Sequence, residues 1–325
     1  MNLLKCKYLT LTTVWVMIAV LLTQLEVIAK PHTSDIKQGA MAAIAHMNIF
    51  QSLVLGFVQG FTEFLPISST AHLKVIPVLL GWGDPGTAYT AVIQLGSIIA
   101  VLSYFWADLK RLVKGAIRAL SLKDYYDYDF RICLSIILGT LPILFFGIMI
   151  KIFIPDFDHS LVRKLSFIAI ASIVMSILLG IGEKFGRRRR DFEKLQIRDG
   201  LSMGVVQVLA LIPGVSRSGS TLTAGLLIGL ERETAARFSF LLGIPAITLA
   251  GLGEVKDAVT IISGGGAGIT SLIVGVISAT VFSYLAIAGL LRFLKTQTTW
   301  VFIWYRLVFG IVILALVNAK VVNGI

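Results

Sequence analysis

Long apolar stretches dominate this chain and limit what it can fold into. Six of them hold roughly 20 residues each, the length that an α-helix needs to cross the hydrocarbon core of a bilayer. Of the 325 residues, 56% are hydrophobic and 14% are charged, whereas soluble domains carry about 25% charged residues. The sequence therefore predicts an all-α integral membrane protein. The six predicted spans cover about 87–106, 130–153, 164–182, 235–254, 266–291 and 300–317.

Two further apolar regions are interrupted near their middles by proline and polar residues. The first covers about 49–82 and contains Pro66, and the second covers about 199–230 and contains Pro213. Proline removes a helical hydrogen bond and clashes with the preceding turn, so neither region is one straight helix. Each is long enough for two half-helices that enter and leave the membrane on the same side. We therefore expect two re-entrant helical pairs beside the six spans.

The two interrupted regions resemble each other, which indicates an internal repeat. A separation of 147 positions relates their prolines (66 to 213) and also relates Gly96 to Gly243. Because three spans lie between the regions, the two copies would have inverted topology. Inverted repeats with broken helices place a site near the middle of the bilayer, where the half-helices meet. Repeat 1 would cover about 48–182 and repeat 2 about 199–317.

The net charge of +11 comes largely from basic residues gathered between the spans. Basic segments stay on the cytoplasmic side of a membrane, which explains the charge without nucleic acid, and we expect no nucleic-acid partner. The basic segments are predicted loops at about 107–129 and 183–198, and a stretch just after 291. Placing them in the cytoplasm puts the segments at 154–163 and 255–265 outside.

Residues 1–46 differ from the rest of the chain. Lys5 and Lys7 precede an apolar run at 8–22, and a polar stretch follows. That order is typical of a signal peptide or an uncleaved anchor, and a true start at Met47 is the alternative. Under either interpretation, residues 47–325 form the membrane domain that carries the chemistry.

The second interruption reads PGVSRSGST at 213–221. Ser216 and Ser218 are good helix caps, and a turn that opens into a helix points N–H groups at an anion. Arg217 adds a planar fork of donors that matches phosphate oxygens. An arginine inside a membrane is a functional candidate by default. The alternative is an internal salt bridge, for which Glu63 is the candidate partner.

The first interruption, within QGFTEFLPISSTAH at 59–72, supplies acid, amide, hydroxyl and imidazole groups. Gln59 and Glu63 are four positions apart on one helix face, where their oxygens can hold a divalent cation. The hydroxyls and the imidazole follow the proline: Ser68, Ser69, Thr70 and His72.

Together with Arg217, these groups suit phosphoryl transfer. A hydroxyl can attack phosphorus while Glu63 or His72 moves protons, and the arginine with a metal ion can stabilise the developing charge. The alternative is that the serines and threonines only satisfy the polar ends of helices.

The two motifs resemble those of the undecaprenyl-diphosphatase family, also called bacitracin-resistance proteins. The likeness runs from about Met47 to the C-terminus and includes IQLGSIIAV, FSFLLGIPA and the pair Tyr305–Arg306. It implies a bacterial inner-membrane enzyme that removes one phosphate from C55-isoprenyl diphosphate. The product would be the monophosphate carrier lipid of peptidoglycan synthesis, and the activity would confer bacitracin resistance. The resemblance also implies inverted repeats with re-entrant segments, a site open to the periplasm, and a divalent cation, Mg2+ or Ca2+.

The same resemblance implies a role for each matching residue. Glu63 would hold metal or a proton, Ser69 would be the nucleophile, and His72 would assist. Arg217 would bind phosphate. The family's first motif has Glu or Gln four positions before the glutamate. Gln59 here leaves a single carboxylate, so the metal stoichiometry stays open. Whether serine or water attacks also stays open. Ser68, Thr70, Ser216, Ser218 and Thr221 would line the phosphate site.

A transporter, such as a flippase of an anionic polyprenyl phosphate lipid, is the second hypothesis. Inverted repeats and broken helices are common in transporters, and an anion site serves either function. A nucleophile and a proton-moving group favour the phosphatase, because transport needs neither. The expected partner is a polyprenyl diphosphate lipid in the bilayer. The sequence leaves open the oligomeric state, a homodimer included, and whether flipping accompanies hydrolysis.

Overall fold

Helices make up most of the part of the chain that the computed structural model describes, which is residues 47–154, 160–263 and 268–321. The predicted extension at 1–46 lies outside these residues. Five of the described helices are long and apolar enough to cross a membrane, and a bent pair brings the number to six. The predicted all-α membrane fold with about six spans is thereby confirmed. The five helices are α7 (Tyr128–Phe153), α8 (Leu165–Phe185), α11 (Arg232–Ser263), α12 (Gly268–Thr296) and α13 (Trp300–Asn318).

The bent pair consists of α5 (Gly86–Tyr104) and α6 (Trp106–Leu122), which meet at an angle of 65°. The sequence predicted a basic loop where α6 lies, and that prediction was wrong. The segment is an amphipathic helix: its buried residues, Leu112, Gly115 and Ala119, recur at spacings of three and four, which is the spacing of one helix face. Basic side chains on the other face hid this pattern.

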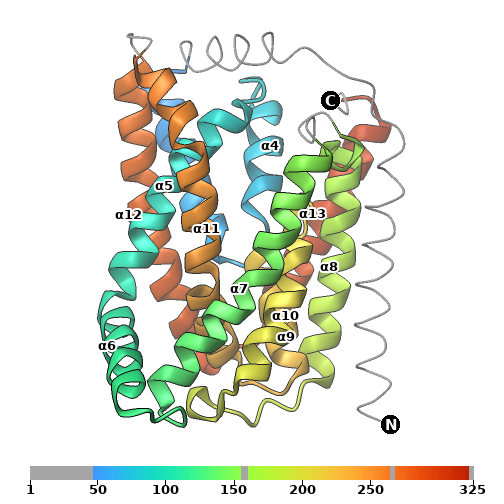
Figure 1. Cartoon of the computed structure of the whole chain (residues 1–325). Coiled ribbons are helices and arrows are strands. Elements are labelled where there is room, and N and C mark those ends of the chain that lie inside the picture. Colours follow the sequence, from blue (N-terminus) through green and yellow to red (C-terminus); the bar gives the residue numbers. More distant parts are fainter. Residues whose placement is uncertain (1–46, 155–159, 264–267, 322–325) are drawn as a thin grey trace.

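Both interrupted regions are broken helices, as predicted. The first consists of α3 (Ile49–Phe64) and α4 (Ser69–Leu79). The second consists of α9 (Ile197–Gln207), the short 3-10 helix η5 (Val208–Leu211) and α10 (Arg217–Leu227). In Figure 1, α4 lies in the upper half of the molecule, whereas α9 and α10 lie in the lower half. The two broken helices therefore approach from opposite ends, and their turns meet inside the protein.

The second half of each broken helix begins in the same way. Both α4 and α10 have 11 residues, and the residues that precede them, Ser68 and Ser216, both have φ of 73°. A positive φ is uncommon for residues other than glycine, and such strained positions gather at functional sites. The second halves of the two broken helices thus begin alike, and the internal repeat stays a prediction.

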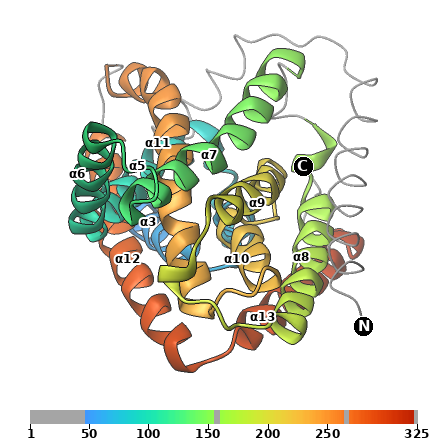
Figure 2. The ribbon, with the colours of Figure 1, turned by 60° about the horizontal axis from the view of Figure 1, so that its bottom comes forward.

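The long helices surround the broken ones. Viewed from nearer one end, α10 lies inside a ring that includes α7, α8, α11, α12 and α13 (Figure 2). Glycines allow the closest approaches: a Cβ on Gly60 of α3 would come within 2.5 Å of the Ala279 carbonyl oxygen of α12. Small residues let helix backbones pack closely inside a membrane, so the ring holds the two broken helices tightly.

Candidate active site

The turns of the two broken helices contact each other directly. Ser218 Oγ of α10 donates a hydrogen bond to the Leu65 carbonyl oxygen after α3, at 2.9 Å. Arg217 Nη2 lies 3.4 Å from Glu63 Oε1. The chain therefore brings together the two polar motifs that the sequence places about 150 positions apart.

Arg306 of α13 ties the two turns together from behind. Its side chain is only 1% exposed, yet it donates to the carbonyl oxygens of Pro66 at 2.9 Å, Gly214 at 2.8 Å and Val215 at 3.0 Å. A buried charge is costly unless hydrogen bonds compensate it, and here carbonyls from both turns do so. The sequence analysis missed this role. An arginine within a predicted span is rare, and that rarity was the available signal.

Glu63 and Ser69 form a hydrogen-bonded pair beside the arginine. Ser69 Oγ donates to Glu63 Oε2 at 2.7 Å, and Gln59 Nε2 donates to the same oxygen at 3.2 Å. The Glu63 side chain is 8% exposed, and its carboxylate contacts Gln59, Ser69 and Arg217. A hydroxyl within hydrogen-bond distance of a carboxylate is the arrangement of a nucleophile and its base.

His72 lies behind the turn rather than beside Ser69. Its Nδ1 is 2.7 Å from the Ser68 carbonyl oxygen, and its Nε2 is 2.7 Å from the Tyr305 hydroxyl. A carbonyl oxygen only accepts, so Nδ1 carries the proton and Nε2 accepts from the tyrosine. The imidazole thus fixes the position of Ser68. Tyr305 is a second residue whose role the sequence analysis missed, because the contact joins α4 to α13.

A cavity of about 180 Å³ opens in front of the two turns. One wall is polar and the other is apolar, which suits a ligand with a charged head and an apolar tail. The polar wall contains Glu63, Ser68, Ser69, Thr70, Ser216 and Arg217, and the apolar wall contains Ile143, Ile212, Ala246, Ile247 and Ala250.

The polar wall carries several groups that favour an anion. Both α4 and α10 begin at residues of this wall, Ser69 and Arg217, and helix N-termini carry partial positive charge and free N–H groups. The Arg217 side chain is 9% exposed, and its Nε has no hydrogen-bond partner among the described residues. The predicted alternative, an ion pair with Glu63, does form. That pair engages Nη2, and Nη1 donates to the Ser239 carbonyl oxygen at 3.5 Å. A guanidinium carries five N–H donors, so the fork keeps donors for a ligand.

Two predicted phosphate ligands have other partners. Ser218 Oγ bonds to the Leu65 carbonyl, and Thr221 Oγ1 donates to the Arg217 carbonyl oxygen at 2.8 Å. Neither lines the cavity, because the first turn of α10 directs both hydroxyls to main-chain oxygens. Ser216 does line it, while its Oγ also accepts from Gly219 N at 3.1 Å. The geometry therefore gives Ser218 and Thr221 a structural task.

The oxygen donors beside Ser69 bear on the predicted divalent cation. No group of three or more histidine, cysteine, aspartate or glutamate side chains that could hold a metal occurs in the described part of the chain. Magnesium, however, usually binds to one or two carboxylates together with substrate phosphates and water. Glu63 with Gln59 therefore fits a divalent cation that is completed by a bound diphosphate.

Comparison with known proteins decides the family. Residues 52–312 match the family described as bacitracin resistance protein BacA. The chain belongs to the BacA family. An undecaprenyl-diphosphatase of Trichormus variabilis is 70% identical over 281 residues, which cover 86% of this chain and 88% of that protein. An undecaprenyl-diphosphatase of Trichodesmium erythraeum is 59% identical, and the match covers 86% of this chain and 89% of that protein. One of Synechococcus elongatus is 57% identical, and the match covers 88% of this chain and 99% of that protein. The BacA match includes both turns and Arg306, so the resemblance of the motifs is confirmed.

Proposed function

We propose that the protein is an undecaprenyl-diphosphate phosphatase, which hydrolyses the C55-isoprenyl diphosphate to the monophosphate and orthophosphate. The observation that carries this proposal is the 2.7 Å hydrogen bond from Ser69 to Glu63 next to the buried Arg217. The printed names of the similar proteins support it. A transporter would need the anion site but no paired hydroxyl and carboxylate, so the geometry favours hydrolysis.

The diphosphate binds with its head on the polar wall and its isoprenyl tail along the apolar wall. Arg217 and the N-termini of α4 and α10 neutralise the phosphate oxygens. Ser69 Oγ then attacks the terminal phosphorus while Glu63 accepts the hydroxyl proton. The bond from that phosphorus to the bridging oxygen breaks, and the lipid monophosphate leaves with the electron pair and with the proton that Glu63 had accepted, so that Glu63 is a carboxylate again.

Water completes the reaction. It attacks the phosphoserine, gives a proton to Glu63, and releases orthophosphate as the Ser69 oxygen regains its proton. His72 holds the Ser68 carbonyl and so keeps the first turn of α4 in place. A divalent cation, Mg2+ or Ca2+, would be held by Glu63 and Gln59 with the diphosphate, where it would neutralise phosphate charge.

We infer that the protein resides in the bacterial inner membrane with its site open to the periplasm. The basic α6 and the Arg187–Arg190 segment lie at the lower end in Figure 1. Basic segments mark the cytoplasmic side. The strip of polar residues that leads from the cavity continues toward the opposite end, past Thr70 and Asp84.

One assay tests the proposal. Purified protein in detergent is given a polyprenyl diphosphate and a divalent cation, and released phosphate is measured. We expect release that a chelator abolishes and that added Mg2+ or Ca2+ restores. A wild-type protein that releases no phosphate, yet moves lipid phosphate across vesicle membranes, would establish the transporter instead.

A further inference from the structure

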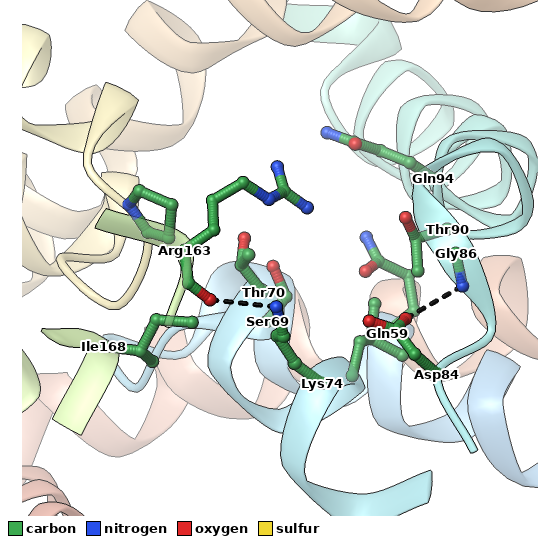
Figure 3. Close-up of a pocket in the computed structure, with 12 residues that line it drawn as sticks. Gln59, Ser69, Thr70, Lys74, Asp84, Gly86, Thr90, Gln94, Arg163 and Ile168 are labelled. Atoms are coloured by element: carbon green, nitrogen blue, oxygen red, sulfur yellow. Dashed lines mark hydrogen bonds between the residues drawn. The ribbon is translucent and has the colours of Figure 1, made fainter. Parts of the chain in front are cut away.

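A second cavity, of about 80 Å³, adjoins the candidate active site. Ser69, Thr70 and Gln94 line both cavities, so the two are neighbours across the predicted nucleophile. The second cavity lies between α4, α5 and the turn Leu161–Arg163 (Figure 3). We call it the outer chamber and define it by Gln59, Lys74, Asp84, Thr90, Gln94 and Arg163.

Two cationic side chains form one wall of the outer chamber. Lys74 lies four positions after Thr70, so the two residues share a face of α4. Its Nζ donates to the Arg163 carbonyl oxygen at 2.8 Å, which ties α4 to the turn before α8. Figure 3 shows the Arg163 guanidinium extending across the chamber, with Thr90 and Gln94 on the far wall. A lysine and an arginine therefore lie next to the hydroxyls of the site.

One carboxylate also lines the chamber, and it has a partner. Asp84 Oδ1 accepts the N–H of Gly86 at 2.9 Å, at the start of α5, where the helix dipole favours negative charge. Among the residues that the structure describes, the lining thus holds two cations and one carboxylate, with hydroxyl and amide groups between them. Guanidinium and ammonium groups beside hydroxyls are a donor set that phosphate binds.

We propose that the outer chamber is a binding site for phosphate, separate from the Arg217 site. The source of the ligand rests on the proposed function: it is either the terminal phosphate of the bound lipid or the orthophosphate released from it. The described chamber residues come mainly from α4, α5 and the turn before α8, whereas the apolar residues of the first cavity come from α7, α11 and Ile212. Phosphate in the chamber therefore contacts a different set of side chains from the lipid tail.

Direct binding tests the chamber without any turnover. Inorganic phosphate is titrated calorimetrically into the purified protein in detergent. A hydrogen bond to a charged group contributes about 1.5–3 kcal/mol, so Lys74→Gln and Arg163→Gln should each weaken binding about tenfold or more. Lys74→Arg and Arg163→Lys keep the charge and should recover most of the affinity. Lys151→Gln removes an exposed cation in the last turn of α7 that does not line the chamber, and it should change nothing.

A second variant separates the chamber from the active site. Arg217→Gln should keep a phosphate-binding event that the further substitution Lys74→Gln weakens about tenfold or more. Wild-type affinity in both glutamine variants of the chamber would overturn the proposal, as would a wild-type protein that binds no phosphate up to high millimolar concentration. Matched thermal unfolding of all variants excludes misfolding as the cause of a loss.

Kinetics with the lipid then distinguishes the two sources. If the chamber holds released orthophosphate, the chamber variants raise the inhibition constant of phosphate and leave KM unchanged. If it holds the terminal phosphate of the substrate, they raise KM for the polyprenyl diphosphate. If the chamber variants hydrolyse the lipid with an unchanged KM and an unchanged inhibition constant of phosphate, the result contradicts the chamber proposal but not the proposed function. Phosphate binding without hydrolysis overturns the proposed function and leaves the chamber standing.

Discussion

Arg217 Nη2 lies 3.4 Å from Glu63 Oε1, although 154 positions separate the two residues. One begins α10 and the other belongs to the last turn of α3. Each broken helix alone presents half of a phosphate site, with the Glu63 carboxylate on one and the Arg217 guanidinium on the other. Their meeting in the protein interior makes a single site whose parts can be tested one at a time.

The arginine fork is the first part to test. Arg217→Ala removes the main cationic donor of the polar wall, and losing one such stabilising group typically costs about 10²–10³ in rate. Arg217→Lys keeps the charge but loses the bidentate geometry, so it should fall between the alanine variant and wild type. Initial rates of phosphate release measure both effects. Full activity in the alanine variant, with normal membrane insertion, would remove Arg217 from the mechanism.

Ser69 and Glu63 can be separated by their different tasks. Glu63→Gln keeps the shape of the side chain but accepts no proton, and general-base catalysis contributes about 10²–10⁴. Ser69→Ala should abolish release if serine attacks phosphorus. Trapping of a phosphorylated Ser69 by rapid quench and mass spectrometry would identify the intermediate. A Ser69→Ala variant that loses less than about tenfold would indicate that water attacks directly, with Glu63 as its base.

The sequence predicted the parts of this site better than their connections. Polar residues and proline inside apolar runs are costly in a membrane, so the two motifs at Pro66 and Pro213 were recognisable without coordinates. The contact of His72 with Tyr305 was not, because it joins helices that no local pattern relates. Lys74 and Arg163 likewise look like ordinary charged residues near segment ends. Their proposed role in phosphate binding follows only from their position beside Ser69, which the structure shows.

Tyr305 tests whether His72 positions the turn. Tyr305→Phe removes the 2.7 Å hydrogen bond to Nε2 but leaves the bond from Nδ1 to Ser68. We therefore expect a loss of only a few fold, whereas His72→Ala also frees the Ser68 carbonyl and should lose more. The pH dependence of the rate provides the control, since a positioning residue changes its height and not its inflections. A shifted inflection in Tyr305→Phe would instead make His72 a proton carrier.

Arg306 should matter mainly for stability. Arg306→Met leaves the carbonyls of Pro66, Gly214 and Val215 without their donor. Each buried polar group without a partner costs about 1–3 kcal/mol. We expect a marked fall in the unfolding temperature in detergent, with activity lost in parallel as the two turns separate. A variant as stable as wild type would show that the turns hold together without this side chain.

Gly243 of α11 tests how closely the arginine is held. A Cβ at this position would overlap the Arg217 guanidinium, and the backbone of a buried helix gives way less readily than the side chain. Gly243→Ala should therefore displace the fork from the cavity, reduce kcat/KM by about the same factor as Arg217→Lys, and leave the helix intact. Gly289→Ala in α12 is the matched control, because a Cβ there meets no atom within 4 Å.

Combining Gly243→Ala with Arg217→Lys tests how the glycine acts. If the glycine acts only by making room for the guanidinium, the double variant is no less active than the less active of the two single variants. Losses that multiply would mean that Gly243 affects catalysis by another route.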